Sequence, residues 1–240
     1  MSYFNLTRNF VSGATAVTLL AGLGMAGAPQ VEAAQLTCTA SAPCMLSDFT
    51  GTDNFFVTAD KFKFGDFGYV PAVNAPEAEG IKVFGEKVGK KVSIVFEGLG
   101  EPLFEVGSGE FGEASLFHTV EILKPDGHFK DLHLSFEAEG VFAGITESVF
   151  DTNVNFPVTT ALLEVNTFPP ASFVDVQDVS DLKLSKIRAE KDIELFGLDE
   201  TAKIFSFRQS YTHDIPEPAT VLGLLTIGGL GFGLKRKSSR

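Results

Sequence analysis

The sequence predicts an all-β fold, an antiparallel and jelly-roll-like β-sandwich of about ten strands, flanked by an N-terminal signal helix and a C-terminal hydrophobic helix. Three observations support this prediction. Apolar and polar residues alternate with a period of two in several segments, as in strands that are buried on one face. Turn-forming glycines and the Pro169-Pro170 pair separate these segments. The nearest candidate for an amphipathic helix, 177–191, does not keep a helical period.

The alternating segments place the strands along the chain. Strands are expected at 54–64, 79–85, 91–97, 116–123, 130–139, 160–167, 172–179, 182–188, 191–196 and 202–212. The stretch from Lys124 to His128 contains Asp126-Gly127, and both of these residues accept positive φ. It therefore predicts a hairpin turn between the strands on either side. A barrel-like closure is the alternative to a sandwich.

Phenylalanine is the main candidate for the core. The chain has 24 Phe, three Tyr and no Trp. Surfaces that bind glycans normally use Trp and Tyr, whose polar edges face water. We therefore expect most Phe side chains to fill the core. An exposed row of Phe or Tyr at one edge of the sandwich would instead favour a ligand-binding surface.

Residues 1–33 have the composition of a secretory signal peptide. Arg8 precedes an apolar stretch from Phe10 to Ala28, and the residues at 31 and 33 suit cleavage before Ala34. A retained membrane helix is the weaker alternative, because serine and threonine dilute the run.

The last 25 residues have three parts in a fixed order. Pro216, Glu217 and Pro218 precede an uncharged run, 219–234, and proline cannot continue a helix. The run would span about 24 Å as a helix, close to the thickness of a hydrocarbon core. It ends in a basic tail, which favours a cytoplasmic position for this end of the chain: Lys235, Arg236, Lys237 and Arg240.

Residues 34–215 remain as one exported domain. Without the two ends, 14 Lys and Arg and 29 Asp and Glu are left, so this domain carries a net charge of −15 against −12 for the whole chain. Such a surface repels nucleic acid and anionic lipid. Cys38 and Cys44 are the two cysteines, and in an oxidising compartment they most simply form one disulfide.

The residues that could carry chemistry form no familiar catalytic or metal-binding pattern. His118 and His133 fall on the two strands of the expected hairpin and His128 lies at its turn, but no third metal ligand is evident there or near His213. We expect these histidines on polar faces or loops, and no metal and no cofactor. Gly107-Ser108-Gly109 lacks the strand and helix of a nucleophile elbow.

Two groups of carboxylates are candidate sites. Glu137 with Glu139, and Glu190 with Asp192, stand two residues apart on expected strands, as solvated outer faces do. A loose acidic series near the N-terminal glycines lacks the spacing of a known calcium loop, although calcium bridging there is an alternative: Asp48, Asp53, Asp60 and Asp66.

The C-terminal 25 residues resemble the PEP-CTERM sorting signals of bacterial exported proteins, through Pro216-Glu217-Pro218, the glycine-rich apolar run and the basic end. The resemblance implies an exosortase-type sorting protease as partner, transient membrane contact through 219–234, and delivery to the cell surface or beyond. The 34–215 domain also looks loosely like small PEP-CTERM-tailed proteins of cyanobacteria, which implies no established activity. That likeness rests on three short matches: Asp60-Lys61-Phe62, Lys191-Asp192-Ile193 and Gln209-Ser210-Tyr211.

These observations predict a non-enzymatic, exported protein with a structural or adhesive role at the cell surface or in the extracellular matrix. A module that binds polysaccharide or calcium is the alternative, and a hydrolase would need two carboxylates that face each other across a cleft.

Overall fold

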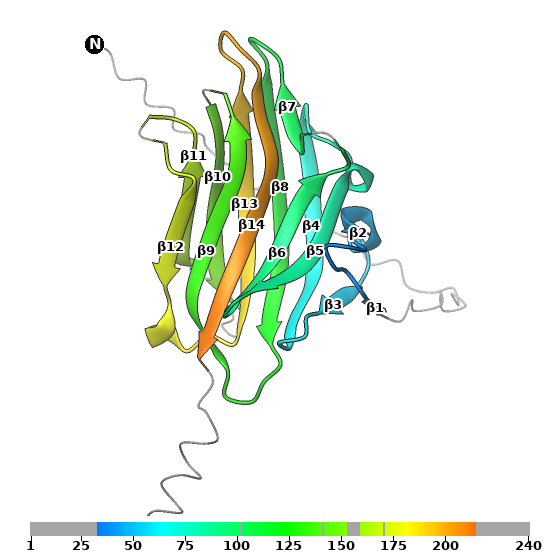
Figure 1. Cartoon of the computed structure of the whole chain (residues 1–240), viewed down its shortest axis with the longest axis vertical. Helices are drawn as coiled ribbons and strands as arrows, with labels where there is room; N and C mark the ends of the chain where they lie inside the picture. The colour runs from blue at the N-terminus through cyan, green and yellow to red at the C-terminus, as the bar shows by residue number, and fades with distance from the viewer. Residues whose placement is uncertain (1–32, 101, 141, 153–158, 170, 215–240) are drawn as a thin grey trace, which may run out of the picture. The chain divides into compact units, whose positions relative to one another are not determined.

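A computed structural model of the chain describes residues 33–100, 102–140, 142–152, 159–169 and 171–214. Within these residues the chain forms two sheets that face each other as a β-sandwich (Figure 1). The all-β prediction is therefore confirmed. The described residues contain fourteen strands, some very short, and no α-helix. The expected signal helix and C-terminal hydrophobic helix lie outside the described residues.

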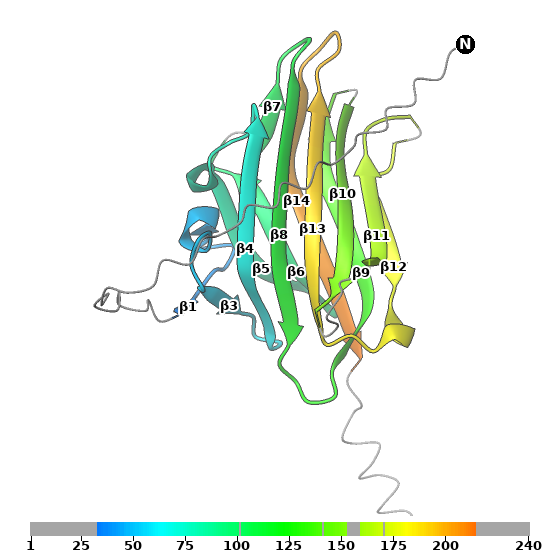
Figure 2. The ribbon, with the colours of Figure 1, turned by 180° about the vertical axis from the view of Figure 1, so that it is seen from behind.

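Sheet A is seen from its outer face in Figure 2, and all its pairings except β1–β3 are antiparallel. Its strands, in spatial order, are β1 (Gln35–Leu36), β3 (Phe55–Val57), β4 (Phe62–Val73), β8 (Phe111–Ile122), β13 (Lys186–Phe196), β10 (Phe142–Asp151) and β11 (Thr159–Asn166).

Sheet B lies toward the viewer in Figure 1. Its strands, in spatial order, are β12 (Val174–Asp178), β9 (His128–Glu139), β14 (Ala202–Asp214), β6 (Lys91–Gly98), β5 (Ile81–Val88) and β2 (Cys44–Met45), and β7 (Phe104–Val106) pairs with β14. Three short 3-10 turns are η1 (Leu46–Asp48), η2 (Ala78–Gly80) and η3 (Ser180–Leu182).

The two sheets are joined along the edge formed by β11 and β12. Asn166 N donates to Ser172 O at 2.7 Å, and Ser172 N donates to Asn166 O at 2.9 Å. The backbone N–H of Glu164 on β11 also donates to Asp175 Oδ2 on β12 at 2.9 Å. These hydrogen bonds partly close the sandwich along this edge, in the direction of the barrel-like closure that is the alternative prediction.

The interior is built largely from phenylalanine, as the sequence predicts. Phe62 of sheet A and Phe129 of sheet B are fully buried with ring centroids 6.1 Å apart. Phe96 and Phe207, both of sheet B, stack at 4.6 Å. These contacts across and within the sheets make one continuous core.

The expected hairpin at Lys124–His128 is wrong. β8, before the turn, pairs with β4 and β13 in sheet A, whereas β9, after it, pairs with β12 and β14 in sheet B. Asp126 does adopt a positive φ of 58°. The prediction of a turn at these residues is thus correct, but the turn connects the two sheets across the core. Two half-buried strands alternate in the same way whether they pair or face each other.

Strand bounds differ from the prediction in two places where a charged residue points inward. β10 was not among the expected strands, and the expected strands 182–188 and 191–196 correspond largely to one strand, β13. Glu147 on β10 and Lys191 on β13 are both fully buried at inward-facing positions. Each interrupts the apolar alternation from which strands were recognised. The expected strand 54–64 is also divided, into β3 and β4.

Cys38 and Cys44 form a disulfide, with their Cα atoms 5.2 Å apart. Cys38 is buried and Cys44 packs against the core, so the bond closes a short loop at the β2 edge of sheet B. Among the described residues there is no helix long and apolar enough to cross a membrane.

Candidate functional site

An open groove of about 220 Å³ lies on the outer face of sheet A, at the end where β8 begins and β13 finishes. Residues of β8, β10, β11 and β13 line it, together with Phe168 just after β11. Side chains alternate between the two faces of a strand, so outward residues at paired positions form rows across the sheet. Three such rows build the groove.

The first row is aromatic. Phe111, Phe196 and Phe142 are consecutive register partners on β8, β13 and β10. Phe168 extends the row by packing on Phe142 with ring centroids 4.9 Å apart. Phe111, Phe168 and Phe196 are 41%, 52% and 36% exposed, so these rings do not belong to the core. The expectation that Phe side chains mostly fill the core fails for this row.

The other two rows are polar. Register pairing places Glu194, Gly144 and Asn166 in the second row, and Asp192, Thr146 and Glu164 in the third. Hydrogen bonds hold two of these carboxylates: Ser115 Oγ donates to Asp192 Oδ1 at 3.1 Å, and Asn166 Nδ2 donates to Glu164 Oε1 at 3.2 Å. Among the described residues that line the groove, none is basic.

Gly144 forms the floor between the polar rows. A Cβ atom added there would lie 3.5 Å from Val165 O and 3.6 Å from Asn166 Cβ, which is ordinary van der Waals contact. The backbone therefore accepts a side chain at this position. The missing side chain leaves room over the sheet, which a larger residue would fill.

The four histidines do not come together. His118 is fully buried between the sheets, where its Nε2 lies 3.0 Å from Tyr211 Oη, so its expected place on a polar face is wrong. Burial and, second, the charge of Lys191 hold the pKa of His118 well below its usual value. His133 is on the outer face of β9, 3.4 Å from Lys91 Nζ. His128, at the start of β9, and His213, near the end of antiparallel β14, lie at the same end of sheet B, where His213 is the register partner of Phe129.

The acidic series near the N-terminal loops is divided among separate partners. Asp48 Oδ2 accepts from Met45 N at 2.8 Å, Asp60 pairs with Lys87 at 2.9 Å, and Asp66 accepts from Thr119 Oγ1 at 2.9 Å. Across the described part of the chain, no group of three His, Cys, Asp or Glu residues is placed to hold a metal ion. This finding covers Asp53 and the groove carboxylates as well.

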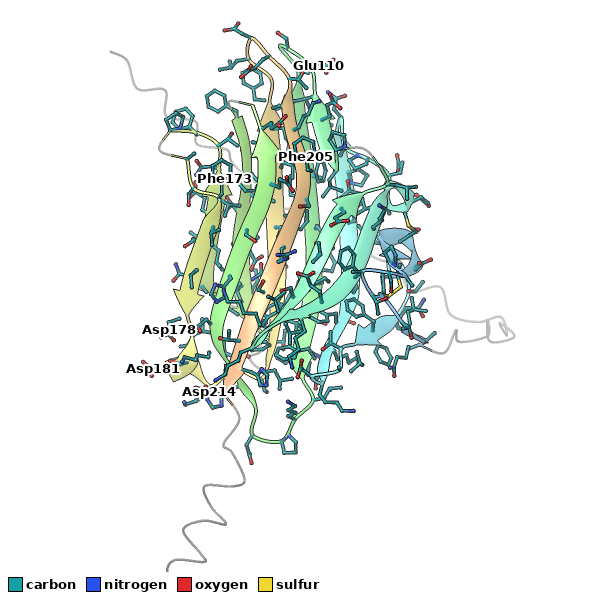
Figure 3. All side chains as sticks on the ribbon, viewed as in Figure 1. Glu110, Phe173, Asp178, Asp181, Phe205 and Asp214 are labelled. Atoms are coloured by element: carbon teal, nitrogen blue, oxygen red, sulfur yellow. A yellow bond between two sulfur atoms is a disulfide. The ribbon has the colours of Figure 1, made fainter. Side chains whose placement is uncertain are left out.

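The remaining sequence candidates are surface features. Glu137 and Glu139 are exposed on β9, as expected for a solvated face. Gly107-Ser108-Gly109 is a tight turn, closed by Glu110 Oε2, which accepts from Gly107 N at 2.8 Å. Figure 3 shows Glu110 near one end of the sandwich and Asp178, Asp181 and Asp214 near the other. Acidic groups are thus spread along the domain.

Comparison with known families identifies the C-terminal segment. Residues 214–237 match the PEP-CTERM protein-sorting motif. The match contains Pro216, Glu217 and Pro218 and ends at Lys237, and these residues lie outside those that the structure describes. The motif indicates an exported protein and implies processing by an exosortase, and the disulfide is consistent with an oxidising environment. The match assigns a signal to the tail and says nothing about the sandwich.

The sandwich itself has distant similarity to several solved structures. TmCBM61 in complex with β-1,4-galactotriose is 14% identical, with a TM-score of 0.32 over 60% of this chain and 87% of that one. A carbohydrate-binding module of family 29 is 13% identical, with a TM-score of 0.20 over 60% and 88%. The enzymatically active domain of tailspike protein 4 of bacteriophage CBA120 is 11% identical, with a TM-score of 0.29, and only 19% of its length is covered.

Similarity at these levels identifies no function for this chain. No curated protein sequence matches the chain. The resemblance of the 34–215 domain to small cyanobacterial proteins gains no support from these comparisons.

Sequence reasoning missed the groove for two reasons. Its aromatic row could not be told from core phenylalanines, because a strand residue's face depends on which strands surround it. Its polar rows come from strands far apart in sequence, and one of these, β10, was hidden by Glu147. The pairing of Glu190 with Asp192 was the one available signal, and Asp192 does line the groove.

Proposed function

We propose that the exported domain is a non-enzymatic, adhesive module that binds neutral polysaccharide along the groove of sheet A. Sorting by the C-terminal signal would bring it to the cell surface or the extracellular matrix. The observation that carries the proposal is the aromatic row, in which Phe111, Phe168 and Phe196 are exposed and Phe142 is partly buried, beside two rows of hydrogen-bonding groups.

A sugar ring has an apolar face of C–H groups and a rim of hydroxyls. The aromatic row offers a flat apolar surface on which such a face can pack. Packing would also remove exposed phenylalanine surface from water, which is favourable. The polar rows offer carboxylate oxygens, which accept hydrogen bonds from hydroxyls, and the Thr146 and Asn166 side chains, which can also donate. The two kinds of surface lie side by side, as a chain of sugars requires.

The charge of the groove selects among polysaccharides. Glu164, Asp192 and Glu194 line it without a basic side chain among the described lining residues. An anionic polymer would meet like charge at close range, which disfavours its binding. A neutral polymer meets only hydrogen-bond partners. The volume of about 220 Å³ is below the roughly 300–1,000 Å³ of pockets that enclose drug-sized ligands, which suits a polymer segment that lies across an open surface.

Binding can be tested by isothermal titration and affinity electrophoresis of the purified protein against neutral glucan, mannan and galactan, with alginate as the anionic comparison. We expect binding to at least one neutral polymer and none to alginate. Phe196→Ala should weaken binding by about tenfold, because a stacked aromatic ring contributes roughly 1–2 kcal/mol. Gly144→Leu should abolish it by filling the floor.

Gly144→Ala is the matched control, because its Cβ atom meets only ordinary contacts. It should fold and bind nearly as the unsubstituted protein does. Equal binding by the Gly144→Leu protein would exclude this groove as the site. Release of reducing sugar ends from a bound polymer would contradict the non-enzymatic part of the proposal.

A further inference from the structure

The aromatic row of the groove, formed by Phe111, Phe196, Phe142 and Phe168, runs across the strands of sheet A. The first three rings stand on β8, β13 and β10, which lie side by side in Figure 2. Neighbouring strands are about 4.8 Å apart, and the ring centroids of Phe196 and Phe142 lie 6.2 Å apart. Phe168 follows at 4.9 Å from Phe142. These steps are comparable with the length that one pyranose adds to an extended chain.

The polar rows of the groove determine the direction in which a sugar chain can lie. Along β13 the outward residues change from Phe196 to Glu194 and Asp192, so a chain that follows this strand would place one sugar on a ring and the next on carboxylates. The polar rows run from β13 over β10 to β11, parallel to the aromatic row. A chain that lies across the strands therefore has aromatic surface beneath it and polar groups along one edge.

The rings of the row do not share one plane. Phe142 is tilted by 58° against Phe196 and by 31° against Phe168. The flat face of a polysaccharide crystal cannot lie on all of these rings together. A single chain can do so, because its glycosidic bonds allow each sugar to rotate relative to the next. The row therefore suits a separate chain and not a packed surface.

The two ends of the row are well exposed. Phe111 and Phe168 are both more exposed than Phe196, and Phe142 between them is partly buried. A site for the end of a polymer needs a wall that stops the chain, and such a wall would cover the last ring. The exposure of both terminal rings fits a chain that continues past them.

Phe168 stands on the connection between β11 and β12, which hydrogen bonds hold against β10. Ala143 N donates to Thr167 Oγ1 at 2.9 Å, and Thr167 N donates to Ala143 O at 2.9 Å. The backbone pair of Asn166 and Ser172 closes the base of the connection. The backbone that carries Phe168 is thus fixed without a ligand, which lowers the entropy cost of binding.

We infer that the groove binds the interior of a single neutral polysaccharide chain, which runs across the strands from Phe111 to Phe168 with one sugar on each of the four rings. The inference rests on the proposed function and adds the form of the ligand to it. The ligand is a soluble or loosely packed chain that is recognised away from its ends. Phe111 and Phe168 hold the outermost sugars of the bound segment.

Isothermal titration of the purified full-length protein tests the length of the site. The probes are cello-, manno- and β-1,4-galacto-oligosaccharides of two to six sugars. For the series whose polymer binds, we expect the affinity to rise several-fold with each sugar up to four and to change little beyond four. A hexasaccharide whose reducing end has been opened by borohydride should bind as tightly as the untreated one, because chain ends are not recognised.

Phe168→Ala removes the ring at one end of the row and should move the plateau of affinity from four sugars to three. Phe173→Ala is the matched control. Phe173 lies on the same connection, but its ring packs on Phe136 of sheet B with centroids 5.7 Å apart, and it does not line the groove. The control protein should keep its plateau at four sugars.

The results separate this inference from the proposed function. Where a polymer binds, a plateau at two sugars, a loss of binding on reduction of the chain end, or an unchanged plateau in the Phe168→Ala protein would overturn the inference and leave the glycan site in place. Binding to insoluble polymer without binding to any soluble oligosaccharide would show that the site needs a packed surface, and would also overturn it. Failure of every polymer to bind would remove the proposed function itself, and this inference with it.

Discussion

His118 should make the stability of the domain depend on pH through a single buried group. Its ring is fully buried, its Nδ1 has no hydrogen-bond partner among the described residues, and it stacks on Phe67 at 5.7 Å. Burial and the charge of Lys191 lower its pKa well below the usual value. In the unfolded chain the same group titrates near its ordinary pKa of about 6.5.

The direction of the pH effect on stability follows from this difference in pKa between the folded and unfolded states. Because the folded-state pKa is lower, the unfolded chain binds a proton first as the pH falls, and protonation favours unfolding. The stability contributed by neutral His118 is present above about pH 6.5 and is lost as the pH falls toward the folded-state pKa. Each pH unit removes at most about 1.4 kcal/mol, and the range from about pH 6.5 to about pH 4.5 samples this loss.

The assay is urea unfolding at several pH values between those limits, for the unsubstituted protein and for His118→Phe with Tyr211→Phe. The double substitution removes the titrating ring and its hydroxyl partner together, and carboxylates titrate alike in both proteins. We expect the loss of stability across this range to be smaller in the variant, by at most about 1.4 kcal/mol for each pH unit. The His133→Gln protein, which is changed at a partly exposed outer position, should lose nearly as much stability across this range as the unsubstituted protein does. An equal loss with and without His118 would refute the reasoning.

Three further outcomes are expected. Removal of residues 216–240 should misroute or release the protein while urea unfolding of the sandwich stays unchanged, and loss of folding would show that the tail belongs to the core. Cys38→Ser with Cys44→Ser should lower the free energy of unfolding by about 2 kcal/mol, a modest loss because the disulfide closes a short loop. An unchanged midpoint in urea would argue against any contribution of the disulfide to stability. Phe207→Ala should lower it by about 3–5 kcal/mol through a cavity beside Phe96, and a loss under 1 kcal/mol would mean that the core refills there.

The buried pair of Glu147 and Lys191 explains where sequence reasoning failed. A strand is recognised by the apolar residues on its inward face, and each of these two residues places a charge there. β10 was overlooked and β13 was divided for this one reason. Their burial is made tolerable by a partner on the neighbouring strand, and such a partner cannot be seen from either segment alone.

The Asp126 turn shows a second limit. The sequence determines that the chain turns there and that the flanking segments are strands, because φ preferences and alternation are local properties. Whether the two strands pair in one sheet depends on the competition among all strands for neighbours. Here β8 pairs with β4 and β13 in sheet A, and β9 pairs with β12 and β14 in sheet B.

The sequence by itself determined the all-β class, the phenylalanine core, the disulfide and the sorting signal, since each depends on residue types and short spacings. Only the tertiary structure decided that three exposed phenylalanines form a row, that carboxylates of β11 and β13 face one groove, and that Lys191 pairs with Glu147. Those arrangements depend on register between strands that are distant in sequence, and register is fixed by packing of the whole sandwich.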